Sequence, residues 1–212
     1  MFDHVTIVEV GPRDGLQNEP KTIGLDEKVN LINLLSTSGL KQIEVGSFVN
    51  PQMVPQMADS GLVFSKITRR PDVSYSALVP NLKGYEQAKK FVPDAIAIFC
   101  SASESFSKAN LNASIDESFK RISQFISRAE QDGILVRGYV SCVTDCPFEG
   151  PVPASNVAKV VAKLREFNCY EISLGDTLGK GSPETIDKMI DNVLNEVSVE
   201  ILAGHLHDTS GL

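Results

Sequence analysis

The sequence predicts an α/β fold of the TIM-barrel type, (β/α)8, with about seven of its eight βα units present. Two observations predict it. Short segments rich in β-branched and apolar residues alternate with longer amphipathic segments. They recur at a spacing of roughly 30 to 40 residues, which a parallel βαβ unit occupies. Strands joined in this way run parallel, because a parallel neighbour needs a crossover helix.

No segment divides the chain into separate domains. There is no hinge-like run of Pro, Gly and Ser and no low-complexity block, so residues 1–212 are interpreted as one catalytic barrel domain. Residues 175–179, GDTLG, do not fit the GxGxxG pattern of a dinucleotide-binding turn. A doubly wound nucleotide-binding fold is therefore disfavoured.

The periodicity of apolar residues places the individual elements. Strands are expected at residues 5–10, 42–45, 74–79, 95–100, 135–141, 170–174 and 200–207, and helices at residues 25–38, 115–131, 154–167 and 183–197. Ser114 and Glu117 have the capping-box pattern, and Ser182 precedes a proline suited to the first helical turn. Because the seventh strand lies near the last residue, we expect an eighth strand, and with it the C-terminal portion of the barrel, to be missing.

The composition is that of an ordinary globular protein. Of the 212 residues, 42% are hydrophobic and 22% are charged, and the mean hydropathy is −0.03. No apolar stretch approaches the ~20 residues that cross a membrane. The first residues lack the features of an export or organelle leader, so a cytoplasmic location is expected. A net charge of −7 without a basic stripe disfavours nucleic-acid binding.

The four cysteines are expected to be free thiols rather than a disulfide framework. Cys142 and Cys146 are spaced like two ligands of a metal site. No second Cys or His pair completes a four-ligand set, so a structural or incidental role is favoured over a zinc site.

Polar and ionisable side chains collect at the C-terminal ends of the predicted strands, where the active site of such a barrel lies. They come from five different strands. Charged residues scattered over a surface would not concentrate at the same end of so many strands. The residues are Arg13, Asp14, Gln17, Glu44, Ser47, Arg137, Tyr139, Glu171, Ser173, Asp176, His205, His207 and Asp208. The predicted substrate contacts among them are Arg13, Gln17, Ser47 and Tyr139.

His205 and His207 give the strongest single indication of chemistry. Side chains at positions i and i+2 of a strand share a face, and Ile201 and Ala203 would lie on that same face. Two imidazoles at a strand end suit a divalent metal, with Asp14 as an oxygen ligand. An isolated HxH is more often a pair of buried, hydrogen-bonded histidines. Two of the three histidines of the chain lie here, however, and this favours the metal site.

The first strand ends in an arginine and an aspartate side by side. The guanidinium of Arg13 could hold an oxygen that gains negative charge, or it could form a structural salt bridge. Glu44 is either an ion-pair partner that orients Arg13 or a direct participant, and the orienting role is favoured. Asp176 could support the histidines, contact the substrate, or act as an N-cap of the next helix.

Six segments, in this order along the chain, resemble the 3-hydroxy-3-methylglutaryl-CoA lyase family of metal-dependent TIM-barrel lyases and synthases. They are VEVGPRDGLQNEP, IEVGSFVNPQMVPQM, VPNLKGYEQA, RGYVSC, YEISLGDTLGKGSP and HLHDTSG. The Arg-Asp-Gly opening and the HxH pair are shared across that superfamily. GPRDGLQNE together with CYEISLGDT is more specific to the lyase branch.

The resemblance implies a reaction and a set of roles. An acyl-CoA, 3-hydroxy-3-methylglutaryl-CoA, would be cleaved to acetyl-CoA and acetoacetate with Mg²⁺ or Mn²⁺, as in leucine catabolism. Asp14, His205 and His207 would be metal ligands, and Arg13 would stabilise the enolate of acetyl-CoA. Glu44 and Asp176 would act with Arg13 in catalysis by supporting the site. A homodimer is left open as a further partner.

One departure from the family pattern leads to alternatives. The family's remaining metal ligand, an asparagine, and its catalytic cysteine on a glycine-rich loop lie downstream of the HxH motif, and none of the four cysteines matches that loop. We therefore expect a truncated lyase with little or no turnover from the 212 residues alone. The alternatives are a related aldolase or Claisen-type acyl-CoA synthase, or an inactive barrel that persists as a binding module.

Overall fold

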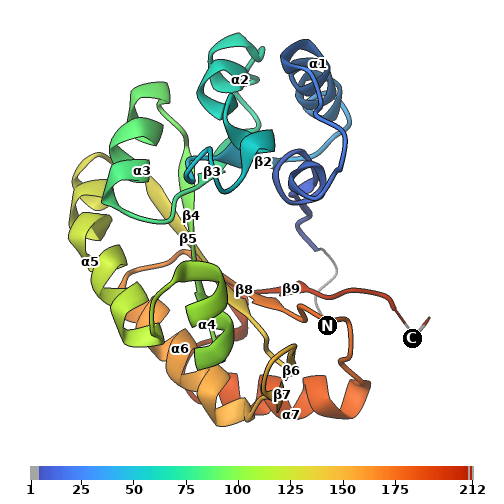
Figure 1. Ribbon diagram of the computed structural model, residues 1–212, viewed down its shortest axis with the longest axis vertical. Coiled ribbons are helices and arrows are strands. Elements are labelled where there is room, and N and C mark those ends of the chain that lie inside the picture. The colour runs from blue at the N-terminus through green and yellow to red at the C-terminus, as the bar shows by residue number, and fades with distance from the viewer. Residues whose placement is uncertain (1–4, 210, 212) are drawn as a thin grey trace. The chain divides into compact units, whose positions relative to one another are not determined.

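Figure 1 shows the computed structural model, which describes residues 5–209 and 211. The chain folds as two compact units, residues 1–97 and residues 98–212. Strand β4 (Ala95–Ser101) begins in the first unit and ends in the second. Parallel strands alternate with helices in both units, which confirms the predicted α/β class.

The described part of the first unit holds parallel strands in the order β1-β2-β3-β4. The strands are β1 (Val8–Glu9), β2 (Gln42–Ser47), β3 (Ser74–Leu78) and the first residues of β4. The helices between them are α1 (Leu25–Leu35), α2 (Ser60–Lys66) and α3 (Leu82–Ala88). Short helical turns are η1 (Gly11–Gly15, a π-turn), η2 (Pro55–Met57) and η3 (Lys89–Phe91).

Strand β2 is buried on both faces, as parallel strands covered by helices are. Ile43 pairs with Tyr75 of β3, and the Tyr75 hydroxyl donates to Ser36 Oγ at 2.9 Å, just after α1. That row of side chains therefore faces the helices. Because successive side chains of a strand point to opposite faces, Glu44 points to the other side of the sheet. It is fully buried there.

The second unit contains β5 (Leu135–Ser141), β8 (Glu171–Gly175) and β9 (Leu202–His205), which are parallel and adjacent in that order. Its helices are α4 (Glu104–Leu111), α5 (Ile115–Gln131), α6 (Ala154–Glu166) and α7 (Pro183–Val193). A small hairpin of β6 (Asp145–Cys146) and β7 (Gly150–Pro151) follows β5, and the turn η4 (Val199–Ile201) precedes β9.

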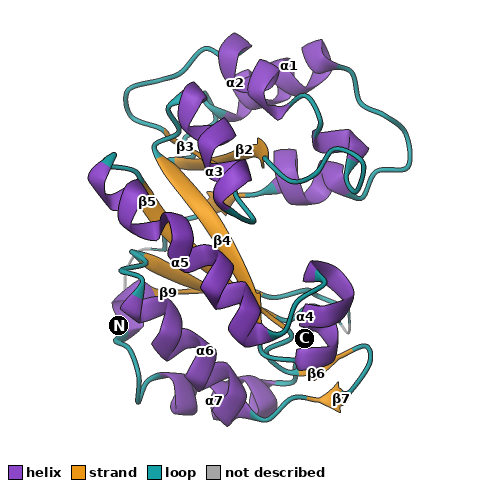
Figure 2. Ribbon diagram, turned by 60° about the vertical axis from the view of Figure 1, so that its left-hand side comes forward, coloured by secondary structure: helices purple, strands orange, loops and turns teal. Residues whose placement is uncertain are grey.

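Helix α5 shows why the second unit forms where the sequence predicts. The Ser114 hydroxyl accepts the Glu117 amide, and the Glu117 carboxylate accepts the Ser114 amide, which completes the capping box. Phe119, Ile122 and Phe125 lie on one buried stripe of the helix. Figure 2 shows α6 and α7 packed side by side, and the hairpin beside α4.

The two terminal strands are shorter than predicted. The expected strand at residues 5–10 is only Val8–Glu9, because the carbonyl of Val10 accepts the amides of Arg13 and Asp14 and turns the chain into η1. The expected strand at residues 200–207 is Leu202–His205, because residues 199–201 form a 3₁₀ turn. His207 therefore lies beyond the strand, and Ile201 does not share its face.

Two other expectations concern the whole chain. All four cysteines are free, as predicted, and the structure also shows that each is buried. In the part of the chain that the structure describes, no helix is long and apolar enough to cross a membrane.

Candidate functional site

The first unit holds an arginine cluster of Arg13, Asp14 and Glu44. The π-turn η1 presents Arg13 and Asp14 immediately after β1. The first residue of this turn is linked to β1, because the Gly11 amide donates to the Glu9 carboxylate at 2.6 Å. Wide turns of this type are frequent at functional sites. Arg13 and Asp14, predicted at the end of the first strand, thus lie in a helical turn directly after it.

Arg13 is held between two carboxylates. Its Nε donates to Glu44 Oε1, and its Nη1 donates to Asp14 Oδ1 at 2.7 Å. Arg13 is 7% exposed and Glu44 is fully buried, whereas the Asp14 side chain is one-third exposed. The ion pair between Arg13 and Glu44 agrees with the orienting role considered for Glu44. One edge of the guanidinium is thereby fixed in a low-dielectric environment.

Two predicted substrate contacts lie in the same unit. Ser47 is the last residue of β2 and is 2% exposed, and its Oγ has no hydrogen-bond partner among the described residues. A buried hydroxyl without a partner is uncommon and indicates a position where a ligand or water completes the bond. Gln17 is half-buried in the helical turn that follows η1.

The second unit holds a histidine cluster, made by Arg137, Tyr139, His205 and His207. The Arg137 guanidinium lies 4.7 Å from the centroid of the Tyr139 ring. The rings of Tyr139 and His205 are 6.5 Å apart, and those of His205 and His207 are 5.2 Å apart, both edge to face. These contacts form a continuous polar and aromatic row across β5 and β9.

Strand β8 lies between those two strands and adds further polar groups. Glu171 pairs in register with Arg137, and its Oε1 accepts the Arg137 Nε at 2.5 Å. Ser173 pairs with Tyr139 on one side and Ala203 on the other. Its buried Oγ has no partner in the described part of the chain. Only strand register brings Glu171 to Arg137, 34 residues away along the chain.

His205 and His207 fit nitrogen ligation of a divalent metal. No hydrogen bond of the His207 ring occurs among the described residues, so its nitrogens are available to a ligand, and the neighbouring His205 ring is close enough to act with it. Within residues 5–209 and 211, no three His, Cys, Asp or Glu side chains lie close enough together to make a complete metal site.

Asp176 organises the loop after β8. Its carboxylate accepts the Thr144 hydroxyl at 2.7 Å and the Gly181 amide at 2.8 Å, and it is 2% exposed. Its own amide donates to the carbonyl of His205 at 3.1 Å. Ser182, not Asp176, is the N-cap of α7, so the N-cap alternative for Asp176 is wrong. Asp176 is instead linked to the last residue of β9, His205.

The thiols of this unit differ in acidity. Burial raises the pKa of Cys142 to about 11, and it raises the pKa of Cys100 and of Cys169 to about 12. Burial also acts to raise the pKa of Cys146. The Ser103 hydroxyl at 2.9 Å and the amides of Phe148 and Glu149 together outweigh it, so the pKa of Cys146 is lowered.

Comparison with known proteins decides the family. The HMGL-like family model matches residues 4–212. The chain belongs to the HMGL-like family. The 3-hydroxy-3-isohexenylglutaryl-CoA/hydroxy-methylglutaryl-CoA lyase of Pseudomonas aeruginosa is 50% identical over 98% of this chain and 69% of its own length. The cytoplasmic 3-hydroxy-3-methylglutaryl-CoA lyase of Danio rerio is also 50% identical, over 98% of this chain and 62% of its own length. The mitochondrial hydroxymethylglutaryl-CoA lyase of Bos taurus is 50% identical over 98% of this chain and 64% of its own length.

Solved structures of HMGL-like proteins confirm the predicted barrel fold. The crystal structure of hydroxymethylglutaryl-CoA lyase from Pseudomonas aeruginosa matches with a TM-score of 0.95 and 50% identity, over 98% of this chain and 69% of that one. The HMG-CoA lyase from Brucella melitensis matches with a TM-score of 0.94 and 50% identity, over 98% of this chain and 74% of that one. The structure of an Acinetobacter baumannii HMG-CoA lyase in complex with coenzyme A and 3-methylmalate matches with a TM-score of 0.92 and 36% identity. The match covers 98% of this chain and 68% of that one. The chain thus spans about two-thirds of these HMGL-like relatives.

Proposed function

We propose that this protein is a hydroxymethylglutaryl-CoA lyase, which cleaves 3-hydroxy-3-methylglutaryl-CoA to acetyl-CoA and acetoacetate by retro-Claisen chemistry. The observation that carries the proposal is the 50% sequence identity to lyases of that name over 98% of this chain. The arginine cluster and the histidine cluster support it, because they supply the cation and the ligands that this chemistry needs.

In this reaction a tertiary alcohol loses its proton while negative charge builds on the thioester oxygen of the departing acetyl-CoA. Arg13 is the residue proposed to hold that oxygen. A fixed cation in a dry site stabilises a developing oxyanion without reorganisation. Glu44 keeps the guanidinium in one orientation, and the one-third exposed Asp14 is the more accessible of its two carboxylate partners.

The proposed metal ligands are Asp14, His205 and His207, and the proposed metal is Mg²⁺ or Mn²⁺. A divalent metal held there would make the substrate hydroxyl easier to deprotonate. The remaining roles fall to this chain's own groups. Asp176 holds the β8 loop against His205. The open hydroxyl of Ser47, together with Gln17 and Tyr139, contacts the acyl-CoA. The same proposal includes a cytoplasmic location, a role in leucine catabolism, a single catalytic domain and a homodimer.

A second substrate has specific support. The Pseudomonas aeruginosa relative is named for 3-hydroxy-3-isohexenylglutaryl-CoA as well as the methyl compound. The same cleavage of a substrate with a longer branch is therefore the second candidate. It requires no change at the arginine or histidine cluster, because the branch lies on the carbon that bears the hydroxyl.

The test is an assay of the purified protein with Mn²⁺ and each of the two thioesters in turn, with acetyl-CoA and the 3-keto acid quantified separately. For residues 1–212 alone, only slow cleavage of the methyl substrate is expected. Cleavage of the isohexenyl substrate alone would favour the second candidate. Condensation of acetyl-CoA with a carbonyl acceptor, without cleavage of either thioester, would identify a synthase instead.

A further inference from the structure

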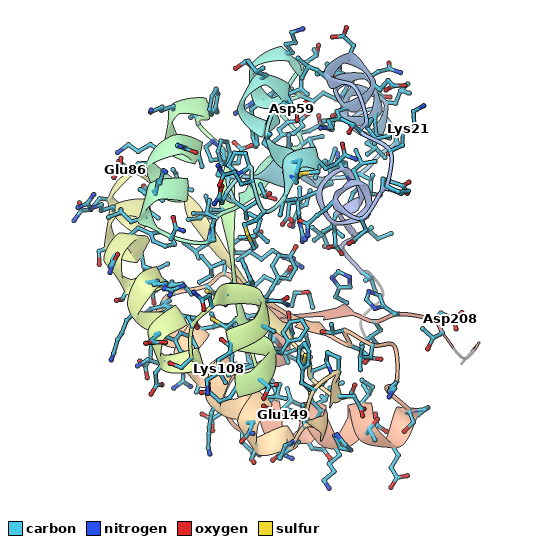
Figure 3. All side chains as sticks on the ribbon, viewed as in Figure 1. Lys21, Asp59, Glu86, Lys108, Glu149 and Asp208 are labelled. Atoms are coloured by element: carbon cyan, nitrogen blue, oxygen red, sulfur yellow. The ribbon has the colours of Figure 1, made fainter. Side chains whose placement is uncertain are left out.

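His207 lies outside the regular structure that would normally orient a ligand. Strand β9 ends at His205, and residues 206–209 follow as an extended, exposed segment. Figure 3 shows Asp208 on this segment. A metal ligand must be held in a narrow range of orientations to bind well. The segment therefore needs a support that the β-sheet does not supply.

Thr209 contacts the loop after β8 and ties the segment to it. The Thr209 hydroxyl donates to the carbonyl of Gly179. The Thr209 amide donates to the carbonyl of His207 at 3.1 Å, which closes a tight turn centred on Asp208, directly after the histidine. The hydrogen bond of the Thr209 hydroxyl therefore holds Thr209 in place, only two residues after His207.

Gly179 is shaped for this contact. It has a φ of +61°, in the left-handed region that side chains rarely adopt, and it is buried. A Cβ at this position would lie 2.4 Å from Thr209 Cγ2 and 3.1 Å from His207 Cβ. Any larger residue would push the segment away. The loop and the segment thus meet at a point where only glycine leaves room.

The loop is itself rigid enough to act as a support. The carboxylate of Asp176 accepts the amides of Gly181 at 2.8 Å and Lys180 at 3.3 Å, and the Gly179 amide donates to the carbonyl of Asp176 at 3.0 Å. The Asp176 amide reaches the carbonyl of His205 at 3.1 Å. The loop therefore holds the segment both before and after His207.

We propose that Thr209 is a positioning residue, which orients His207 through its contact with Gly179. The contact itself is independent of the proposed lyase function, but its consequence for metal binding rests on that function. Groups that support metal ligands in this way typically contribute 10- to 100-fold to metal affinity. Thr209 touches neither the proposed substrate contacts nor the arginine cluster in any described interaction.

The test uses the variants Thr209→Val and Thr209→Ser, with Thr37→Ala as the matched control. Thr37 is an exposed threonine of the first unit whose hydroxyl also donates to a backbone carbonyl, that of Leu34 at 2.8 Å. Two quantities are measured. One is hydrogen exchange of peptides covering residues 203–209 without metal, and the other is Mn²⁺ affinity from the electron paramagnetic resonance signal of the free ion.

Thr209→Val is expected to speed exchange in residues 203–209 and to weaken Mn²⁺ binding by about tenfold or more. Thr209→Ser, which keeps the hydroxyl, and Thr37→Ala should match the wild type in both. Unchanged exchange in Thr209→Val would overturn the proposal, as would faster exchange with wild-type Mn²⁺ affinity. If the wild type itself binds no Mn²⁺ while exchange still responds to Thr209→Val, the contact stands and the proposed metal site fails.

Discussion

The Arg13 guanidinium donates through Nε to the carboxylate of Glu44, a side chain that is fully buried. The two residues lie on the turn after β1 and on β2, adjacent parallel strands of the first unit. Separating two buried opposite charges is costly, so the pair is held in one geometry, and Asp14 is a second carboxylate on Arg13. This relationship links the fold of the first unit to its proposed chemistry.

Glu44→Gln should destabilise the protein substantially. The substitution keeps the size of the side chain but leaves the Arg13 charge with a weaker partner in a buried position. Removing one partner of a buried pair costs about 3–5 kcal/mol. Urea unfolding followed by circular dichroism measures the loss. Glu166→Gln is the control, because Glu166 pairs with Lys163 on an exposed face, where such pairs contribute less than about 1 kcal/mol. Equal small effects of the two variants would contradict the buried-pair account.

Arg13→Lys should reduce turnover more than substrate affinity. Lysine keeps the positive charge but lacks the planar fork that contacts Glu44 and the substrate oxygen at once. Loss of a group that stabilises an oxyanion typically lowers kcat by about 10²- to 10³-fold. Steady-state kinetics with 3-hydroxy-3-methylglutaryl-CoA give kcat and KM separately. A rise in KM with kcat intact would indicate that Arg13 only binds substrate.

His205→Ala and His207→Ala should each abolish tight binding of Mn²⁺. Each substitution removes one of two adjacent imidazoles, whose rings are 5.2 Å apart. Isothermal titration with Mn²⁺ measures the affinity, and melting temperature with and without Mn²⁺ measures the linked stabilisation. Asp191→Asn, on α7, serves as a control that should bind normally. Wild-type affinity in either histidine variant would remove that residue from the proposed ligand set.

Cys146 should be the first thiol to be alkylated in the native protein. Only the thiolate reacts, so a lowered pKa places more of Cys146 in the reactive form at neutral pH. Cys100 and Cys169, whose pKa values are raised to about 12, stay protonated. Peptide mapping after brief iodoacetamide treatment at pH 6, 7 and 8 measures the order. The Cys146 rate should level off at a lower pH than that of an ordinary thiol. Modification of Cys100 before Cys146 would contradict the hydrogen-bonded thiolate.

Periodicity and capping predicted part of the fold from the sequence. Helix α5 and strand β5 have the predicted bounds, because a complete capping box starts the helix and the residues Leu135, Val136, Tyr139 and Val140 favour a strand. Helix α2 was not predicted. It is seven residues long and contains Gly61, where a Cβ would lie 2.5 Å from the Phe91 ring. That glycine reflects a tertiary contact, which a local pattern cannot show.

The candidate site was predictable in its residues but not in its contacts. The strand-end pattern identified Arg13, Glu44 and the two histidines. The pairing of Arg137 with Glu171 depends on the register between β5 and β8, which periodicity does not determine. The contact between Thr209 and Gly179 depends on a loop conformation with positive φ. Strand register and loop geometry are set by the packed fold, so local sequence pattern misses both.

Product analysis after adding Mn²⁺ to the metal-free protein tests the central claim most directly. 3-Hydroxy-3-methylglutaryl-CoA is supplied, and acetyl-CoA and acetoacetate are quantified by mass spectrometry before and after the metal is added. Proposed metal-assisted cleavage predicts no products before addition and equal amounts of the two products afterwards, with Arg13→Lys giving far less of both. Cleavage at the same rate without metal, or in the Arg13→Lys variant, would contradict it.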